Sequence, residues 1–184
     1  EDVRFYEHSG IDFIALGRAV VKRGLMGQKS AGGGSTITQQ LAKQLFTEKA
    51  HSVAERLMQK PIEWVIAVQL ERTYTKDEII ALYLNYFDFL HNAVGIKTAS
   101  NTYFGKDPKN LSVNEAATLI GLCKNPSYFN PVRHPERCVE RRNVVLAQME
   151  KAGYLSASHC DSLSNLPLGL NFHVSDHKDG IATY

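Results

Sequence analysis

Cysteine, tryptophan and long apolar runs are scarce in this chain of 184 residues. Its three cysteines, Cys123, Cys138 and Cys160, are widely spaced and form no Cys-x-x-Cys or Cys/His pattern of the kind that binds zinc. We therefore expect packing residues with free thiols. The sequence has no signal-peptide pattern and no run of about 18 apolar residues. Because it starts with Glu rather than Met, we expect a piece of a longer protein, with any membrane anchor outside this sequence.

An excess of either charge is also lacking, since Lys and Arg number 21, Asp and Glu number 19, and the formal net charge is +2. This balance argues against bulk attraction to nucleic acid or to a strongly anionic membrane. No zinc-finger, homeodomain or RNA-recognition signature is present, so we expect no nucleic acid partner. The length suits one domain with a substantial core, which could have two lobes.

Strand-like alternation and fixed-period repeats are missing, and apolar residues recur at helical spacing instead. Capping boxes predict helix starts at Thr36, Thr75 and Ser112, while Pro135 and Gly153 suit the beginning and end of a further helix. The sequence therefore predicts an all-α fold, with helices over 11–23, 36–46, through 57–70, and over 76–87, 113–122, 135–152 and 156–164.

Some of these segments carry further expectations. The apolar spacing in 11–23 predicts a core helix ended by Gly24. Pro61 removes an N–H group, so the helix around it either begins near residue 60 or bends there. Residues 166–184 show no clear period. We expect one domain over 1–165, with 166–184 as a tail or the beginning of a following segment.

The stretch richest in chemistry is Gly-Gly-Gly-Ser-Thr-Ile-Thr-Gln-Gln at residues 32–40. Three glycines let the backbone turn sharply and lie close to a ligand. The helix that follows would offer free N–H groups, hydroxyls and nearby Lys43 to an anion such as phosphate. The alternative is a flexible loop before an ordinary capped helix, and the P-loop ending Gly-Lys-Ser/Thr is absent.

Gly-x-Ser-Thr-Ile-Thr-Gln-Gln resembles the second signature of the bacterial peptidoglycan glycosyltransferases, which polymerise lipid II into glycan strands. Other signatures of this family follow in its order along 1–150. Residues 1–10 match Glu-Asp-x-x-Phe-x-x-His-x-Gly, and Gln-Lys-Pro-Ile-Glu at 59–63 is similar to Arg-Lys-x-x-Glu. Residues 76–85 resemble Lys-x-x-Ile-Leu-x-x-Tyr-Leu-Asn, and 141–146 resemble Arg-x-x-x-Val-Leu. Gln59 and Pro61 are the main departures from the pattern.

The resemblance implies a lysozyme-like helical fold with a main lobe and a smaller, membrane-facing jaw lobe. It implies that the C4 hydroxyl of a lipid II acceptor attacks C1 of a growing strand, which releases undecaprenyl pyrophosphate. Displacement by an outside hydroxyl should invert the anomeric centre. The implied partners are lipid II, the growing strand, the membrane surface and other cell-wall synthesis proteins. The implied location is the outer face of the bacterial cytoplasmic membrane.

By the same resemblance, Glu1 is the general base and Glu63 is the second functional carboxylate, acting near the pyrophosphate directly or through a divalent metal, Mg²⁺ or Mn²⁺. No organic cofactor is implied. The residues expected to contact substrate are polar or cationic: Asp2, Arg4, Ser35, Thr36, Thr38, Gln39, Gln40, Lys43, Lys60 and Arg141.

Other interpretations stay open. Taken alone, residues 1–10 would be a solvated terminus, Glu63 a surface Glu, and Arg142 a solvated charge. A lysozyme-like, glycan-cleaving enzyme would share a helical fold and a catalytic Glu, but it needs no pyrophosphate site. A catalytically impaired relative that only binds lipid II or glycan is favoured by Gln59 and Pro61 and opposed by Glu1 and Glu63.

Overall fold

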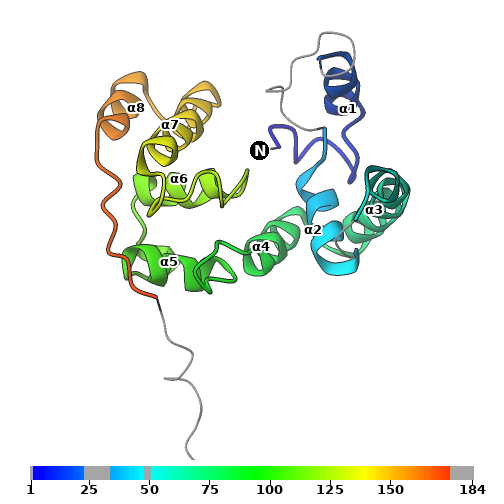
Figure 1. The fold of residues 1–184 in the computed structure, drawn as a ribbon. Coiled ribbons are helices and arrows are strands. Elements are labelled where there is room, and N and C mark those ends of the chain that lie inside the picture. The colour runs from blue at the N-terminus through cyan, green and yellow to red at the C-terminus, as the bar shows by residue number, and fades with distance from the viewer. Residues whose placement is uncertain (1, 23–33, 48–50, 175–184) are drawn as a thin grey trace, which may run out of the picture. The chain divides into compact units, whose positions relative to one another are not determined.

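The computed structural model describes residues 2–22, 34–47 and 51–174. Within these ranges the fold is all-α, with eight α-helices and one isolated β-bridge, which joins Asp88 and Val94 (Figure 1). The elements are α1 Phe13–Val20, α2 Ile37–Phe46, α3 Val53–Thr73, α4 Lys76–Tyr86, α5 Ile96–Phe104, the 3-10 helix η2 Pro108–Asn110, α6 Val113–Leu122, α7 Pro135–Lys151 and α8 Ala157–Ser164. The prediction of an all-α fold is therefore confirmed. None of these helices is both long and apolar enough to span a membrane.

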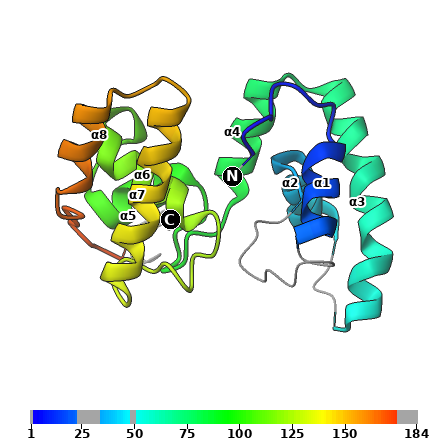
Figure 2. The same ribbon diagram turned by 90° about the horizontal axis from the view of Figure 1, so that it is seen from above.

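The chain divides into two compact units, Glu1–Tyr86 and Phe87–Tyr184. In the first unit, α2 packs against both α3 and α4 (Figure 2). Leu41 of α2, Ala67 of α3 and Ile79 of α4 are fully buried. The helix at the centre of this unit therefore carries the residues of the second signature.

Residues 2–10 precede α1 and are attached to the same unit. Phe5 is buried. Gly10 has a φ of +92°, and a Cβ atom there would lie 2.9 Å from the carbonyl carbon of Ala67. Only glycine avoids both the backbone strain and this clash, so Gly10 lets the segment lie directly against α3.

Helix caps are formed largely where the sequence predicts them. Thr36 accepts a hydrogen bond from Gln39 N, and Ser112 forms a complete capping box with Glu115. Thr75 and Glu78 exchange the equivalent bonds. The Thr75 N–H and Oγ1 both donate to the Glu78 carboxylate, which holds the pKa of Glu78 below its ordinary value. Gln39 departs from the box, because its side chain donates to Gly10 O rather than to the backbone of Thr36. The caps depend on residues close in sequence, which is why pattern alone finds them.

One helix prediction is wrong, and one of the two alternatives for the helix around Pro61 is excluded. Residues 13–20 form α1, but it has no buried residue, and Phe13 and Ile14 are 72% and 69% exposed. It is therefore not a core helix, and Gly24 lies outside the described residues. α3 begins at Val53, not near residue 60, and runs through Pro61. The missing N–H of Pro61 would have bonded to Leu57 O, and both residues are exposed, so water can satisfy that carbonyl.

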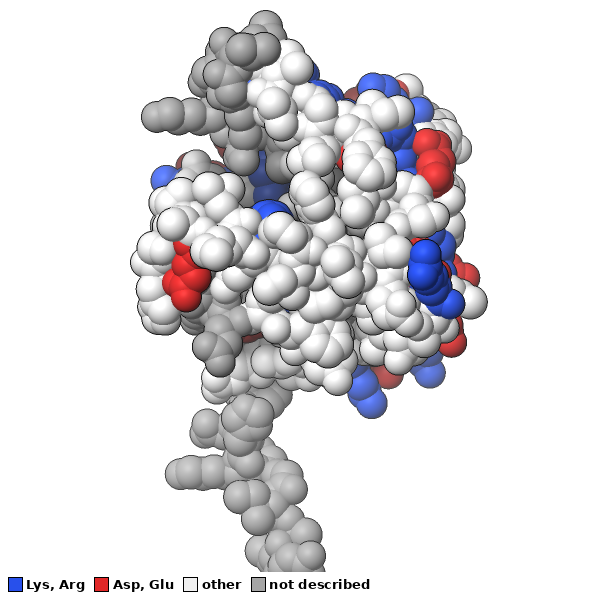
Figure 3. All heavy atoms as spheres, turned by 90° about the vertical axis from the view of Figure 1, so that its right-hand side faces the viewer, with Lys and Arg blue, Asp and Glu red and all other residues white. Residues whose placement is uncertain are grey.

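Exposed apolar side chains also continue along α3 in the first unit. The apolar side chains of α3 that are more than half exposed are Val53, Leu57, Met58, Ile62 and Val65. Figure 3 shows a face of the molecule on which charged side chains lie mainly toward the edges. Apolar surface on adjacent turns of one helix is characteristic of interaction sites.

In the second unit, α6 packs on α7 and α7 packs on α8, around Ala117, Leu146 and Cys160. The three cysteines are buried and free, as predicted, and burial raises the pKa of Cys138 to about 11. Residues 166–174 run back toward α5 (Figure 1), where Asn171 N and His173 N donate to Tyr103 O and Thr102 O.

The interpretation of Arg142 as a solvated charge is wrong. Its side chain is fully buried rather than solvated. The guanidinium donates to the carbonyls of Ser164 at 2.9 Å and Leu166 at 2.7 Å, at the C-terminal end of α8. A cation at the negative end of a helix dipole is favourable, so Arg142 joins α7 to α8.

Candidate active site

The first signature is fixed to the beginning of α2 through Asp2. The Asp2 carboxylate accepts a hydrogen bond from Ile37 N at 3.0 Å and pairs with His8 Nε2 at 3.0 Å. Ile37 is the first residue of α2, so this carboxylate lies at the positive end of the helix dipole. Glu1, the predicted general base, lies outside the described residues. It directly precedes Asp2, which the structure anchors.

Gly10 provides a second attachment between these signatures. Its carbonyl oxygen accepts hydrogen bonds from Thr36 Oγ1 at 2.7 Å and from Gln39 Nε2 at 3.1 Å. Both side chains are almost fully buried, with exposed fractions of 2% and 3%. Thr36 and Gln39 therefore hold the backbone of residues 2–10 against α2. Their predicted contact with substrate stays a prediction.

A buried polar chain then joins the fourth signature to the first two. Thr38 Oγ1 donates to Glu71 Oε1 at 2.6 Å, and Lys76 Nζ pairs with the same carboxylate at 2.8 Å. Lys76 also donates to His8 O at 2.6 Å and lies 4.4 Å from the ring centre of Phe5. Lys76 and Thr38 thus connect three signatures through the Glu71 carboxylate, and the shared bonds hold these segments together.

Glu63 is the centre of a separate group of charges. Its side chain is fully buried, so the alternative of a solvated surface Glu is wrong. Lys60 Nζ donates to Glu63 Oε2 at 2.8 Å, and Arg56 Nη1 donates to Glu63 Oε1. Lys60 Nζ also donates to Ser35 Oγ at 2.9 Å, which joins the third signature to the second. Both carboxylate oxygens are therefore engaged by cations.

Lys43 adds a further positive charge beside this group. Although its side chain is exposed, desolvation lowers the pKa of Lys43, and the nearby charges of Arg56 and Lys60 lower it further, whereas Glu63 raises it. Two cations thus contact one carboxylate and a third interacts with the same charges, which leaves positive charge that Glu63 does not balance. Such an arrangement suits an anion carrying more than one negative charge, such as a pyrophosphate.

The sequence matches the family described as transglycosylase over residues 1–150. The chain belongs to the transglycosylase family. The resemblance carried by the signatures is therefore confirmed.

This transglycosylase chain is 44% identical over 179 residues to penicillin-binding protein 1F of Bacillus subtilis, and 41% identical over 176 residues to penicillin-binding protein 1A of Escherichia coli. The matches cover 97% and 96% of this chain but only 24% and 20% of those relatives. The 2.6 Å crystal structure of penicillin-binding protein 1A from Haemophilus influenzae is similar in fold, with a TM-score of 0.50 and 30% identity over 73% of this chain and 17% of that one.

Three further predicted site residues of the transglycosylase chain have partners other than Glu63. Arg4 forms a two-bond ion pair with Asp12, which is also the N-cap of α1. Gln40 accepts a hydrogen bond from Tyr83 Oη at 3.2 Å. Arg141 belongs to α7 in the second unit, where its guanidinium lies 5.9 Å from the ring centre of Phe129. Their roles toward substrate stay predictions.

Sequence reasoning missed Arg56. Arg56, Lys60 and Glu63 are spaced four and three residues apart, so they share one face of α3. This spacing was a usable signal, because two cations one and two turns before a carboxylate predict ion pairs. The match to Arg-Lys-x-x-Glu begins at Gln59, so Arg56, three residues earlier, lies outside the matched pattern.

The side chains around Glu63 do not resemble the ligands of a metal ion bound by the protein. No group of three or more His, Cys, Asp or Glu side chains that could hold a metal ion occurs among the residues described. Glu63 is already paired with two cations, and these cations would repel a divalent metal placed beside them. The described residues therefore do not fit a metal bound by the protein alone.

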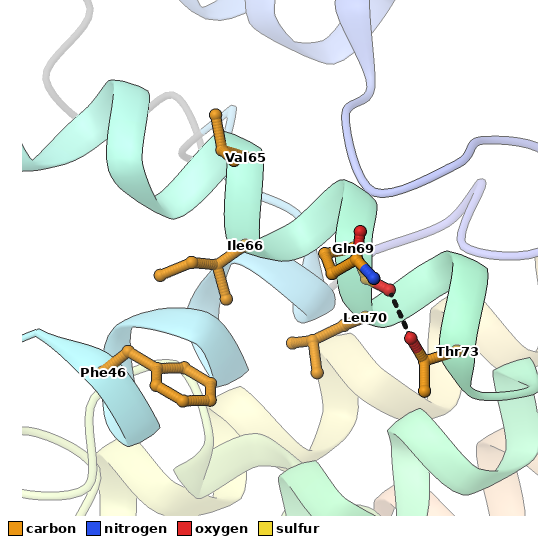
Figure 4. Close-up of a pocket in the computed structure, with 6 residues that line it drawn as sticks. All are labelled: Phe46, Val65, Ile66, Gln69, Leu70 and Thr73. Atoms are coloured by element: carbon orange, nitrogen blue, oxygen red, sulfur yellow. Dashed lines mark hydrogen bonds between the residues drawn. The ribbon is translucent and has the colours of Figure 1, made fainter.

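An apolar pocket of about 340 Å³ lies between the end of α2 and the second half of α3. Figure 4 shows Phe46, Ile66 and Leu70 turned toward one another in this pocket, with Thr73 Oγ1 bonded to Gln69 O at the side. None of its lining residues was predicted to bind substrate. The polar site and this apolar pocket therefore use different turns of α3.

Proposed function

We propose that this transglycosylase domain polymerises lipid II into β-1,4 glycan strands. The C4 hydroxyl oxygen of lipid II forms a bond to C1 of the growing strand. The bond between C1 and the pyrophosphate oxygen breaks, so undecaprenyl pyrophosphate leaves and the anomeric centre inverts. The hydroxyl proton passes to Glu1, the general base.

The observation that carries this proposal is the cluster of Lys43, Arg56 and Lys60 around buried Glu63. The leaving pyrophosphate gains negative charge as the bond to C1 breaks, and cations fixed in advance stabilise that charge without rearranging. Lys60 also bonds to Ser35 in the second signature, next to the beginning of α2. Ser35, Gln40 and Lys43 would therefore line the donor side, with Thr36, Thr38 and Gln39 fixing the backbone there. Arg4 and Arg141 would orient sugar or phosphate.

Glu63 acts in this proposal by holding the cations. Because both of its oxygens already accept hydrogen bonds from Lys60 and Arg56, it is poorly placed to remove a proton itself. If a divalent metal takes part, it enters with the pyrophosphate rather than through a set of protein ligands.

The lysozyme-like architecture, the jaw lobe and the location at the outer face of the membrane belong to the same proposal. The exposed apolar residues Phe13 and Ile14 of α1, and those along α3, support contact between this part of the chain and lipid. Other cell-wall synthesis proteins are proposed partners on the strength of the family alone.

The test is lipid II polymerisation followed on gels, in detergent and with a divalent metal, using a chain with additional residues ahead of Glu1. Those residues prevent a Gln at a free N-terminus from cyclising. Loss of the general base in Glu1→Gln should lower the rate by about 100-fold or more. Glu63→Gln should lower it by at least about tenfold, because the cations lose their partner. Glu140→Gln, on the exposed face of α7, is the control and should retain activity.

A binding module is the second candidate, favoured by Gln59 and Pro61. Well-folded protein that binds lipid II without forming strands would establish it. Shortening of preformed glycan would instead mean a glycan-cleaving enzyme.

A further inference from the structure

The third signature of this chain has Gln59 where the family pattern has Arg, yet a guanidinium is present beside it. Arg56 lies three residues earlier, almost one turn of α3 before Gln59. Its Nη1 donates to Gln59 Oε1 at 3.2 Å and also to Glu63 Oε1. A guanidinium thus lies against both the first and the last residue of the signature.

We propose that Arg56 takes the place of the signature arginine and binds the pyrophosphate together with Lys60 and Lys43. This inference rests on the proposed function, because it names a further binding residue for the same leaving group. Gln59 is then a positioning residue, whose amide oxygen orients the guanidinium from which it accepts a hydrogen bond.

The exposure of Arg56 favours ligand binding over a purely structural ion pair. Its partner Glu63 is 1% exposed, whereas the Arg56 side chain is 32% exposed. Arginine has five N–H donors in a fixed plane, and a single nitrogen, Nη1, makes both bonds described above. The remaining edge of the plane can donate to two phosphate oxygens at once, which an ammonium cannot do.

The charges of neighbouring side chains support the same conclusion. Arg56 and Lys60 share Glu63, and the charge of Arg56 lowers the pKa of Lys43. Without Arg56, Glu63 would balance one of the two remaining cations, and the attraction for a pyrophosphate would fall. With Arg56 in place, the chain recovers the charge that the change from Arg to Gln at residue 59 removes.

The experiment measures binding of inorganic pyrophosphate by calorimetry, in the full chain and in four variants, alongside lipid II polymerisation. Arg56→Gln should weaken pyrophosphate binding by about tenfold or more, because a charge-assisted hydrogen bond is lost. Arg56→Lys should recover part of the loss, because lysine keeps the positive charge but lacks the planar pair of N–H donors. Arg72→Gln, in the exposed last turn of α3, is the matched control and should stay within about twofold of the parent.

The decisive variant is the double substitution Arg56→Gln with Gln59→Arg, which moves the guanidinium to the position of the family pattern. It should restore most of the binding lost in Arg56→Gln. Arg56→Gln that is folded by circular dichroism and binds pyrophosphate like the parent would overturn the inference, as would a parent chain that binds no pyrophosphate.

The outcomes for this inference and for the proposed function are separate. Binding that depends on Arg56, without strand formation by the parent, would support the inference and count against polymerisation. Strand formation that survives Arg56→Gln unchanged would support the proposed function and overturn the inference.

Discussion

At the scale of single residues, the site depends on which side chains are already engaged before substrate arrives. Thr36, Gln39 and Thr38 are buried and bonded within the chain, whereas Lys43 is exposed and near other cations. Residues of one signature therefore divide into those that fix the backbone and those that can meet an anion. Sequence similarity gives both groups the same weight, and burial separates them.

Lys43 should make pyrophosphate binding sensitive to alkaline pH. Desolvation and the charge of Arg56 lower its pKa below the ordinary 10.5, so the ammonium loses its proton at a lower pH than a solvated lysine does. Binding by the parent should therefore weaken as pH rises, while Lys43→Arg stays charged and keeps its affinity. Near neutral pH the two should agree within about twofold.

The measurement is a titration of inorganic pyrophosphate from about pH 7 to about pH 10. Lys109→Arg, on the exposed 3-10 helix η2, is the matched control and should follow the parent at every pH. Equal loss of affinity in the parent and in Lys43→Arg would show that Lys43 does not contribute to the anion site.

At the scale of elements, caps and buried cations determine how helices begin and how they join. The cap residues Thr36, Thr75 and Ser112 could be predicted because the partners of a cap lie within one turn. The burial of Arg142 could not, because its acceptors at Ser164 and Leu166 lie 22 and 24 residues away in the sequence. The burial of Arg142 depends on the packing of α8 on α7, which no local sequence pattern predicts.

Arg142→Ala should destabilise the chain by about 3 kcal/mol, because it removes several charge-assisted hydrogen bonds and leaves a cavity between α7 and α8. Urea unfolding followed by circular dichroism measures this loss. Arg133→Ala, an exposed arginine in the loop before α7, should change the free energy of unfolding by less than about 0.5 kcal/mol. A loss below about 1 kcal/mol in Arg142→Ala would mean that water replaces the guanidinium at little cost.

At the scale of the whole molecule, the family, the all-α fold and the group around Glu63 could be reached from sequence, since the signatures carry them. Three features were missed or left open. α1 has helical spacing but is exposed, because periodicity does not reveal whether another element covers a face. α3 continues through Pro61, because its exposed surface tolerates the lost hydrogen bond. Arg56 brings a guanidinium to the third signature from almost one turn before it, and a comparison of aligned positions does not detect an arginine that has moved along the helix.

The division into two units leads to a prediction about where the second unit ends. Residues 166–174 were expected to be a tail, but Arg142 donates to Leu166 O, and Asn171 and His173 donate to α5. Their contacts therefore lie within the unit that α6, α7 and α8 form.

A piece spanning residues 87–174 should be helical and unfold cooperatively in urea, because it contains its own core and both sets of bonds. A piece ending at residue 165 loses these bonds and should unfold at a clearly lower urea concentration. Identical unfolding midpoints would instead place the boundary of the domain at residue 165, with 166–184 outside it.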